Sequence, residues 1–487
     1  MSGTFSVYHI ASSGMSVYQA NLSVVSHNLS NVNTTGSSRQ RATTAEKTID
    51  AANGTAYGDG VSVTEVSRIR DTLIDNTYRQ DNAKASYWDV KNNLLEDAET
   101  LLNEYSSSSS DESTGLQQTI KDFYNSWDDL TSDPSSQSSR SQVVEYATAL
   151  VDTINQINDQ LIQMQQEASG EVTDSVDSIN NIAQQIAKLN SQIRMGNSSG
   201  SSVNDLKDQQ DELLDELSAQ VNINVQEGSN GAVKVSIGGI TLVEDNTVNK
   251  LAAVQNGDTI TVEWPQFDCD AQITSGSLKA YLEEADSSAV TAITDTSTYD
   301  FNTDSCSSIG NLRQGLNDLI TTIADKVNNL LTSGKDLDGN SGQALFVTKD
   351  SNKPMQIGNI TIDSDIENDV DKIAAGTSGE SDDSTIASEI SSLQDETNFS
   401  YDGLVVNTTD FYQQLTSWIG TAGNTASSNY DTQDTLLQEV KTQRDSLSSI
   451  STDDELAAMI VYQNAYNANA KVFSIIDSLL NDFIKDV

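Results

Sequence analysis

The residues able to carry chemistry are few in this sequence, and none stands in a catalytic or metal-binding pattern. His9 and His27 are its only histidines, whereas a metal site or a Ser-His-Asp triad needs histidine beside acidic or nucleophilic partners in a pocket. We interpret both as polar residues on a helix face. The segment starting at Asp336 (Asp-Leu-Asp-Gly-Asn) has the acidic spacing of a calcium loop, but the glycine and the bidentate glutamate of an EF-hand would fall on Ser341 and Val347. We therefore expect a turn there, with no metal, no cofactor and no enzyme.

Two further sets of reactive side chains favour structural roles. Cys269 and Cys306 could form one bridge or remain free thiols, since two cysteines do not make a disulfide framework. Five acids stand at every second position, as the solvated edge of a strand would place them: Asp363, Asp365, Glu367, Asp369 and Asp371.

Composition excludes several classes of partner. The 487 residues suggest about three domains, yet only 36% are hydrophobic and 6% aromatic, which is typical of long helices and thin β layers. The formal charge of −46 repels nucleic acid and anionic membranes. We interpret the many acidic residues as a means of keeping the protein soluble in a salty medium outside the cell. No signal-peptide pattern and no apolar run of about 18 residues is present. We expect no nucleic-acid partner, no membrane insertion, and either a cytoplasmic protein or one that leaves without a cleaved signal.

The clearest apolar pattern lies at the two ends, where a helix must position each residue. Spacings of three and four alternate along both ends, which is the heptad seam of a coiled coil. We expect the two seams to pair, or to bundle with copies of themselves; two ordinary amphipathic core helices are the alternative. A second apolar file widens the C-terminal seam: Ala465, Ala468, Val472, Ile475 and Leu479. The seam residues, which we predict to be the assembly interface, are Tyr8, Ala11, Met15, Tyr18, Leu22, Val25, Leu29 and Val32, and Met459, Tyr462, Tyr466, Asn469, Phe473, Ile476, Leu480 and Phe483.

The interior alternates between helical and extended periods. Helical spacing predicts helices at about 71–104, 116–130, 143–195 (interrupted at Ser169-Gly170), 205–217, 309–331 and from about 383 to the end, whereas a period of two predicts a β insertion over 219–305. The fold class is mainly α with an inserted β domain. We expect an elongated molecule with paired terminal helices, a long helical hairpin as a rod and the β domain distal. The predicted domains are 1–45 with 446–487, 46–218 with 306–445, and 219–305.

Several blocks match known motifs: residues 28–36 and 38–40, 60–63, 68–71, 78–79, 122–126, 204–214 and 462–471. Through them the chain resembles the bacterial flagellar axial protein family of rod, hook and junction proteins, and in its interior blocks the hook-associated protein 1 family. The resemblance covers nearly the whole helical part and is weakest in 225–305. Thr35 and Ser37 depart from it, since the family has proline and tyrosine around this glycine. The signature residues are Asn28, Asn31, Gly36, Arg39, Gln40, Asn204, Asp205, Leu206 and Asp211.

The resemblance implies a structural component of the flagellum outside the cell, joining hook to filament and required for filament assembly. It implies these partners: copies of the chain in a ring, hook protein, the second junction protein (hook-associated protein 3), an export chaperone and the flagellar type III export apparatus. The terminal helices would line the inner tube, and export would need no cleaved signal. The alternatives are another axial subunit of hook or rod type and, from a different class, a secreted adhesin or enzyme that uses the β insertion.

Overall fold

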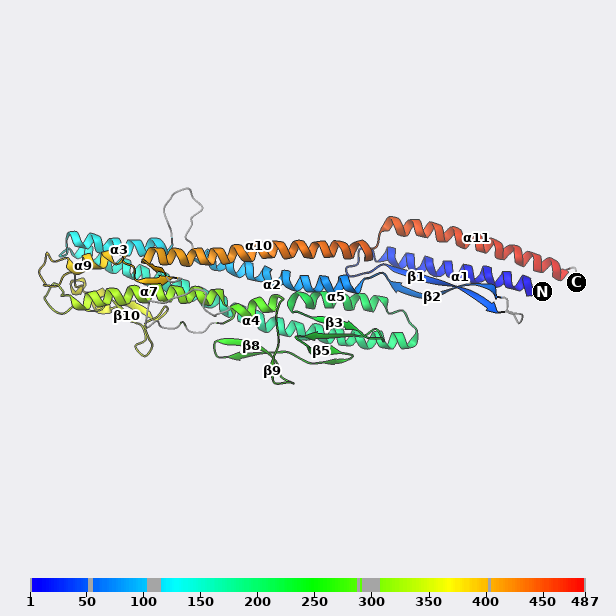
Figure 1. Cartoon of the computed structure of the whole chain (residues 1–487), viewed down its shortest axis with the longest axis horizontal. Coiled ribbons are helices and arrows are strands. Elements are labelled where there is room, and N and C mark those ends of the chain that lie inside the picture. Colours follow the sequence, from blue (N-terminus) through cyan, green and yellow to red (C-terminus); the bar gives the residue numbers. More distant parts are fainter. Residues whose placement is uncertain are drawn as a thin grey trace.

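The computed structural model describes residues 2–50, 56–102, 115–286, 290, 307–401 and 404–485. The molecule is elongated, with both termini at one end and a bundle of long helices leading away from them (Figure 1). The predicted fold class is thereby confirmed.

The end that carries the termini consists of two helices and one hairpin. Helix α1 (Ser2–Ser30) packs along α11 (Thr452–Lys485), and the antiparallel strands β1 (Gln40–Asp50) and β2 (Ala56–Arg68) run beside α1 (Figure 1). Acids fill the first turn of α11, where they complement the partial positive charge of a helix start. We call α1 and α11 the terminal pair; its formation confirms that the two ends meet.

The rod is organised around α4 (Gln137–Ser199) and α2 (Thr72–Leu102). Helix α4 packs against α3 (Leu116–Ser132), α5 (Asn204–Gln220) and α7 (Ser308–Ser333), and α10 (Thr408–Ser448) lies along α2. The predicted interruption at Ser169-Gly170 is wrong, because α4 is continuous there. A glycine inside a helix costs about 1 kcal/mol. The buried neighbours Ala168, Val172 and Val176 hold this turn against the core and offset that cost.

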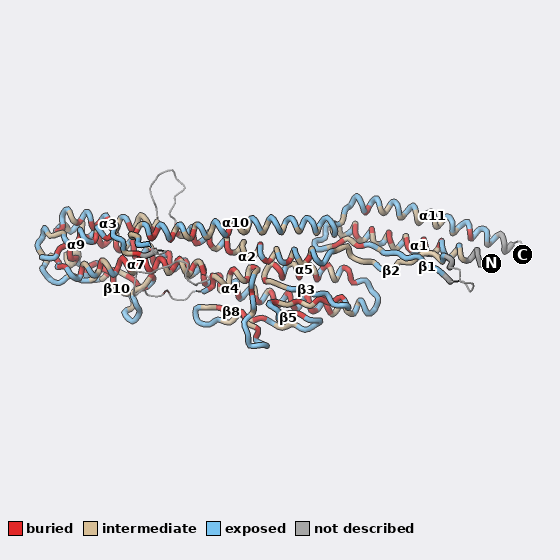
Figure 2. Tube along the Cα trace, in the orientation of Figure 1, coloured by how far each residue is buried: buried red, intermediate tan, exposed pale blue. Residues whose placement is uncertain are grey.

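Two hydrophobic cores follow each other along α4. One fills the half of the rod far from the termini. There the ring of Phe123 packs edge-to-face with Trp127, and its centroid lies 5.9 Å from that of Phe346. The other lies between the second half of α4, α5 and the β insertion. Buried residues are dense in both and sparse in the terminal pair (Figure 2).

The β insertion forms a four-stranded sheet of β3 (Asn224–Glu227), β4 (Val233–Ile237), β5 (Ile240–Glu244) and β6 (Thr247–Val248). A three-stranded sheet follows, with β7 (Ala252–Asn256), β8 (Thr259–Trp264) and β9 (Cys269–Asp270). Alternate residues of β4 and β8 are buried, as the period of two predicts. Both sheets lie beside the middle of the rod, not at its distal tip as expected (Figure 1), because their apolar faces pack on Val172, Ile179 and Ile186 of α4.

A short helix, α6 (Ser277–Glu284), attaches the insertion to the rod. Its last residue, Glu284, is fully buried and pairs with Lys91 of α2. The same carboxylate accepts from the backbone N–H groups of Ser308 (3.0 Å) and Ile309 (2.9 Å) at the start of α7. One side chain therefore joins three helices.

The far end contains β10 (Phe346–Thr348), β11 (Ile360–Ile362), α8 (Ser364–Asn368), the 3-10 turn Val370–Lys372, α9 (Thr385–Ser392), β12 (Phe399–Tyr401) and β13 (Leu404–Val406). Two expectations fail here. The acids of 363–371 form helical turns instead of a strand edge, because Asp363 and Asp369 cap them by accepting from the N–H groups of Asp365 and Asp371. The helix expected from 383 onward stops at Ser392, and the hairpin β12–β13 precedes α10.

Helix asparagines hold the extended segments in place. In four cases among the described residues, the side-chain amide of one helix asparagine bonds both the backbone N–H and the C=O of a single residue, as a neighbouring strand would. We call these contacts asparagine clamps. The pairs are Asn28–Gln40, Asn180–Leu251, Asn190–Val233 and Asn328–Phe346, with distances of 2.7–3.0 Å.

Candidate assembly site at the terminal pair and the joint

The predicted seams face each other across the terminal pair. The rings of Tyr8 and Phe473 lie 4.5 Å apart and those of Tyr18 and Tyr462 6.3 Å apart. Every seam residue of the N-terminal end is buried or half-buried, from Tyr8 to Leu29 on α1 and Val32 just after it. The same holds for the seam residues of α11 from Met459 to Ile476, while the side chains of Leu480 and Phe483 lie outside the described residues.

The second apolar file of α11 is mostly exposed within the described part of the chain, with only Ala465 half-buried. Ile475 is 53% exposed, whereas its neighbour Ile476 is 6% exposed against α1. Val461, Val472 and Leu479 are exposed on the same side as Ile475. Contiguous exposed apolar surface of this kind is typical of an interaction site.

Three chain segments meet α5 where the terminal pair joins the rod: residues 31–40, 68–79 and 444–455. We call this region the joint. Backbone bonds tie the segments together, since Arg39 N–H donates to Ser448 O (2.9 Å) and Ile69 N–H donates to Arg39 O (2.8 Å). Gly36 has a φ of +78°, the left-handed region that favours glycine, and a Cβ there would lie 3.2 Å from Glu212 Oε2 of α5. The signature glycine thus allows the loop to turn close against α5.

Polar signature residues connect α1, β1 and α11 at the joint. Asn28 clamps Gln40 and also donates to Glu455 Oε2 at 3.2 Å. Arg39 Nε donates to Glu455 Oε1 at 2.7 Å, and Glu455 is almost fully buried. These bonds fix the first turn of α11 against the end of α1.

The start of α5 supplies the other side of this network. Asn204 donates to Gln40 Oε1 at 3.1 Å, and Gln40 donates to Asp205 Oδ1 at 2.9 Å. His27 lies 3.2 Å from Asp205, and Asn31 donates to the backbone oxygen of His27. Leu206, the residue after Asp205, is half-buried and takes no part in these hydrogen bonds. The structure therefore brings most of the predicted signature residues together, and His27 is a member of the same network.

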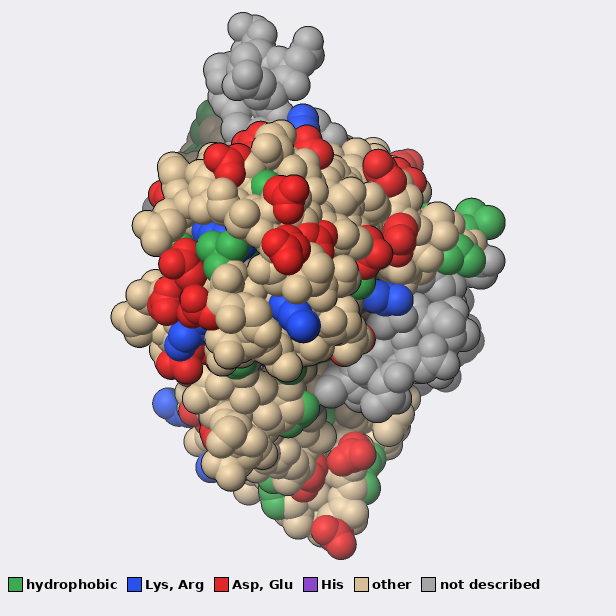
Figure 3. Space-filling model, turned by 90° about the vertical axis from the view of Figure 1, so that its left-hand side faces the viewer, with side chains coloured by type: hydrophobic (Ala, Val, Ile, Leu, Met, Phe, Trp, Pro, Cys, Tyr) green, Lys and Arg blue, Asp and Glu red, His purple; other side chains and the backbone are tan. Residues whose placement is uncertain are grey.

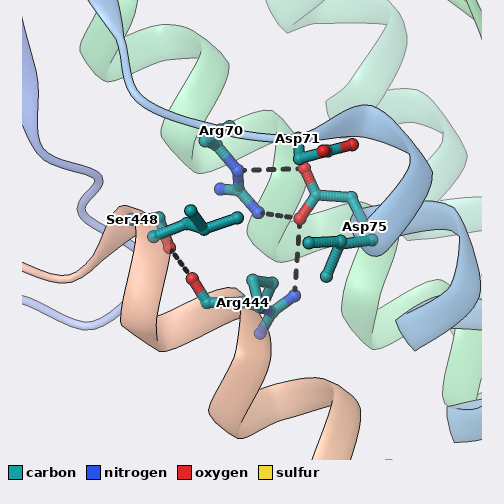
Figure 4. A pocket seen from close by; sticks show the side chains of 7 residues that line it. Arg70, Asp71, Asp75, Arg444 and Ser448 are labelled. Atoms are coloured by element: carbon teal, nitrogen blue, oxygen red, sulfur yellow. Dashed lines mark hydrogen bonds and ion pairs between the residues drawn. The ribbon is translucent and has the colours of Figure 1, made fainter.

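Four arginines and four aspartates form the centre of the joint, and we call them the Arg–Asp cluster. Asp211 accepts from Arg68 (2.7 Å) and Arg79 (2.8 Å), with Arg70 at 3.3 Å. Asp208 pairs with Arg68, and Asp215 with Arg79 and Arg444. Arg70 donates two hydrogen bonds to the carboxylate of Asp75, from Nε at 3.1 Å and from Nη2 at 2.8 Å. Arg444 lies 4.0 Å from the same carboxylate (Figure 4). The members are Arg68, Arg70, Arg79, Arg444, Asp75, Asp208, Asp211 and Asp215.

Asp211 and Arg70 keep their charges despite burial. Burial disfavours the charged form of Asp211, but the arginines Arg70, Arg68 and Arg79 outweigh it and hold the pKa of this carboxyl below its ordinary value. Burial likewise opposes the charge on Arg70, yet Asp211 and Asp75 raise its pKa. Removal of any one member would leave its partners buried and uncompensated, which destabilises the folded chain.

Sequence reasoning missed this cluster as a unit. The motif blocks contain Arg68, Arg70, Arg79 and Asp211, but Asp75, Asp215 and Arg444 were not singled out. One signal was available: Asp208, Asp211 and Asp215 are spaced three and four apart, which gives α5 an acidic stripe.

The sites considered for chemistry have structural partners. Asp336 Oδ1 accepts from the N–H of Asn340 at 2.7 Å, as in the expected turn. Among the described residues no group of His, Cys, Asp and Glu could hold a metal ion, and no helix there is long and apolar enough to span a membrane. Cys269 is exposed, and Cys306 lies outside the described residues. The face of the far end is mostly neutral and polar with scattered acids (Figure 3), unlike the apolar file of α11.

Three sequence models of flagellar proteins match separate parts of the chain. The sequence model described as the flagellar hook-associated protein FlgK helical domain matches residues 102–346. Models for the flagella basal body rod protein and for the C-terminal part of the flagellar basal body rod FlgEFG proteins match residues 9–36 and 443–485. The latter two matches cover most of the terminal pair.

Similar proteins span the whole chain. Flagellar hook-associated protein 1 of Bacillus subtilis is 29% identical, with 99% of this chain and 98% of that protein covered. Its counterpart in Salmonella typhimurium is 25% identical, with 98% and 99% covered. The solved flagellar hook junction protein FlgK of Burkholderia pseudomallei has a TM-score of 0.60 at 15% identity, covering 77% of this chain and all of that one. That likeness supports the fold.

Proposed function

The chain belongs to the FlgK family of flagellar hook-associated proteins, structural proteins of the hook–filament junction, and from this premise we propose that the exposed file of α11 is the surface through which it assembles. The seam residues hold the terminal pair together, and the file beside them binds neighbouring subunits. The Arg–Asp cluster fixes the direction in which the rod leaves the terminal pair. The proposal assigns the chain no catalytic role.

The observation that carries the proposal is the contrast between Ile475 and Ile476. Adjacent residues of one helix differ from 53% to 6% exposure, so α11 has two apolar sides and α1 covers only one. Burying apolar surface contributes about 25 cal/mol per Å². A helix that leaves such a file in water is therefore stabilised by any neighbour that covers it.

Interaction with other flagellar components follows from family membership, and the particular partners are our proposal. Copies of the chain would lie side by side in a ring, with hook protein on one side and the second junction protein, hook-associated protein 3, on the other. An export chaperone and the flagellar type III export apparatus would handle the chain before assembly. We also propose the division into 1–45 with 446–487, 46–218 with 306–445, and 219–305.

The chain is part of the flagellum outside the cell, and we propose that it reaches this place without a cleaved signal peptide. Export through the flagellar apparatus would explain an N-terminal helix that is itself a structural element of the terminal pair. Sequencing the N-terminus of the protein recovered from detached flagella tests this point. Loss of an N-terminal segment would contradict it.

The experiment that tests the assembly surface uses adjacent positions of α11. Ile475→Asp places a charge in the exposed file, and Ser474→Asp adds the same charge at an exposed neighbouring position. We expect Ile475→Asp to abolish filament retention on cells without lowering the melting temperature of the purified chain, and Ser474→Asp to assemble normally. Retained filaments in Ile475→Asp cells would overturn the proposal. Long tubes formed by the purified chain alone would instead indicate a hook-type subunit.

A further inference from the structure

A small cleft lies at the base of the terminal pair, beside the joint. It encloses about 220 Å³ between α1, the first turns of α11 and β1. Its wall includes Val24, Val25, Ala42, Ala458 and the ring of Tyr462, with Arg39 and Arg41 at its polar side. Sites for small organic ligands usually enclose about 300–1,000 Å³, so this cleft has the size for one or two side chains.

The charge of the cleft is opposite to that of the molecule. Arg39 is neutralised by the buried carboxylate of Glu455. Arg41 is exposed and makes no ion pair with any residue that the structure describes. The cleft therefore carries one uncompensated positive charge on a chain whose formal charge is −46.

The cleft is continuous with the exposed file of α11. Ala458 lines it, and Val461 and Ala465 follow at spacings of three and four, so all three lie on one side of the helix. Ala458 lies one helical turn before Val461. A neighbouring molecule that covers α11 from Leu479 to Val461 therefore reaches the cleft if its contact extends by one more turn.

We propose that this cleft receives an acidic side chain from a second copy of the chain, whose carboxylate pairs with Arg41 while its stem packs on Ala42 and Tyr462. The inference rests on the proposed assembly surface. It adds a polar contact that sets the alignment of one copy along the next, because an apolar file alone specifies that alignment weakly. A second copy is the occupant because the cleft adjoins the file proposed for self-assembly, and because this chain has 72 acids to offer against 26 bases. Between such acidic copies, an uncompensated arginine inside a cleft beside the file favours the alignment that brings a carboxylate to it.

The test compares two charge reversals on the same strand, made in the full chain. Arg41→Glu reverses the charge in the cleft, and Lys47→Glu makes the same change at an exposed position of β1 that does not line it. Neither residue makes a side-chain ion pair with the described residues, so both variants should melt like the parent. We expect Arg41→Glu to reduce incorporation at hook tips about tenfold, Lys47→Glu to leave it within about twofold, and Arg41→Lys to restore most of it.

A photo-crosslinking amino acid at Ala42 identifies the occupant in assembled flagella. We expect a crosslink to a peptide of the same chain that contains Asp or Glu. A crosslink only to a different flagellar protein, or equal incorporation of Arg41→Glu and Lys47→Glu, would overturn the inference. Ile475→Asp distinguishes a failure of the cleft inference from a failure of the proposed assembly surface. If Ile475→Asp blocks assembly while Arg41→Glu does not, the cleft inference alone fails. If Ile475→Asp assembles, the proposed surface fails first.

Discussion

Arg444 in the last turn of α10 donates to Asp215 of α5 at 2.6 Å, which joins residues 229 positions apart in the chain. The guanidinium also lies 3.8 Å above the ring of Tyr78, an arrangement that adds a cation–π attraction. The two residues stand at the edge of the Arg–Asp cluster, and Asp211 stands at its centre.

Asp211→Asn should therefore destabilise the joint strongly. Three arginines lose their shared carboxylate, and breaking a buried ion pair from one side costs about 3–5 kcal/mol. Urea denaturation measures the free energy of unfolding, with Glu216→Gln as the control because Glu216 is exposed on the same helix. Equal stability of the two variants would show that the cluster is dispensable. Because the arginines lower the pKa of Asp211, its contribution is present above the ordinary pKa of 3.8 and is lost as pH falls through the lowered value.

Asp318 in α7 should give the opposite dependence on pH. Burial raises its pKa from 3.8 to about 8. Its Oδ2 has no hydrogen-bond partner among the described residues, while its Oδ1 accepts from Gln314 at 2.8 Å. The raised pKa means that the folded chain holds a proton that the unfolded chain releases, so stability falls as pH rises from about 4 to about 8.

Asp318→Asn should remove this loss of stability. The variant and the parent should melt alike at about pH 4, and the advantage of the variant should grow as pH rises, to a few kcal/mol near pH 9 (about 1.4 kcal/mol per pKa unit). Melting curves at pH 4, 7 and 9 measure the effect. Asp325→Asn, at an exposed position of the same helix, should leave the parent's pH dependence unchanged. A parallel pH profile for Asp318→Asn would contradict the assignment.

The asparagine clamp at Asn180 should hold the β insertion to α4. Asn180→Ala removes two bonds and leaves the N–H and C=O of Leu251 without their partner, and each unsatisfied buried group costs about 1–3 kcal/mol. Hydrogen exchange at the Leu251 amide should accelerate, and the free energy of unfolding should fall by about 2–4 kcal/mol. Asn181→Ala changes the exposed neighbour and serves as the control. Unchanged protection at Leu251 would refute the role of the clamp.

Gly14 should set how closely the terminal pair packs. A Cβ at Gly14 would lie 2.8 Å from Asn469 Oδ1 across the pair, so Gly14→Ala must push the asparagine side chain aside. In an Asn469→Ala background the same change should become stabilising by up to about 1 kcal/mol, because alanine is the better helix former. Hydrogen exchange along α11 in the four combinations measures this coupling. If Gly14→Ala has the same effect in both backgrounds, the two residues are not in contact.

The sequence by itself determined the two terminal seams and most of the order of helical and β segments, and it left open whether the seams pair with each other or with copies of the chain. Spacings of three and four place Tyr8 and Tyr18 on one side of α1, and Tyr462 and Phe473 on one side of α11. This follows from the local geometry of a helix and does not depend on how the helices pack. The period of two in β4 and β8 likewise predicted their buried faces. Local signals failed at Gly170, where burial on both sides of a glycine outweighs its low helix propensity, and at 363–371, where aspartates cap turns.

Only the tertiary structure decided which polar residues meet. Arg68, Arg79 and Arg444 come from β2, α2 and α10, and their common partner is the stripe on α5. No local period relates residues so far apart, because their contact depends on how complete helices pack. The same reason separates Ile475 from Ile476: both belong to the apolar pattern of α11, and only the position of α1 leaves one of them exposed.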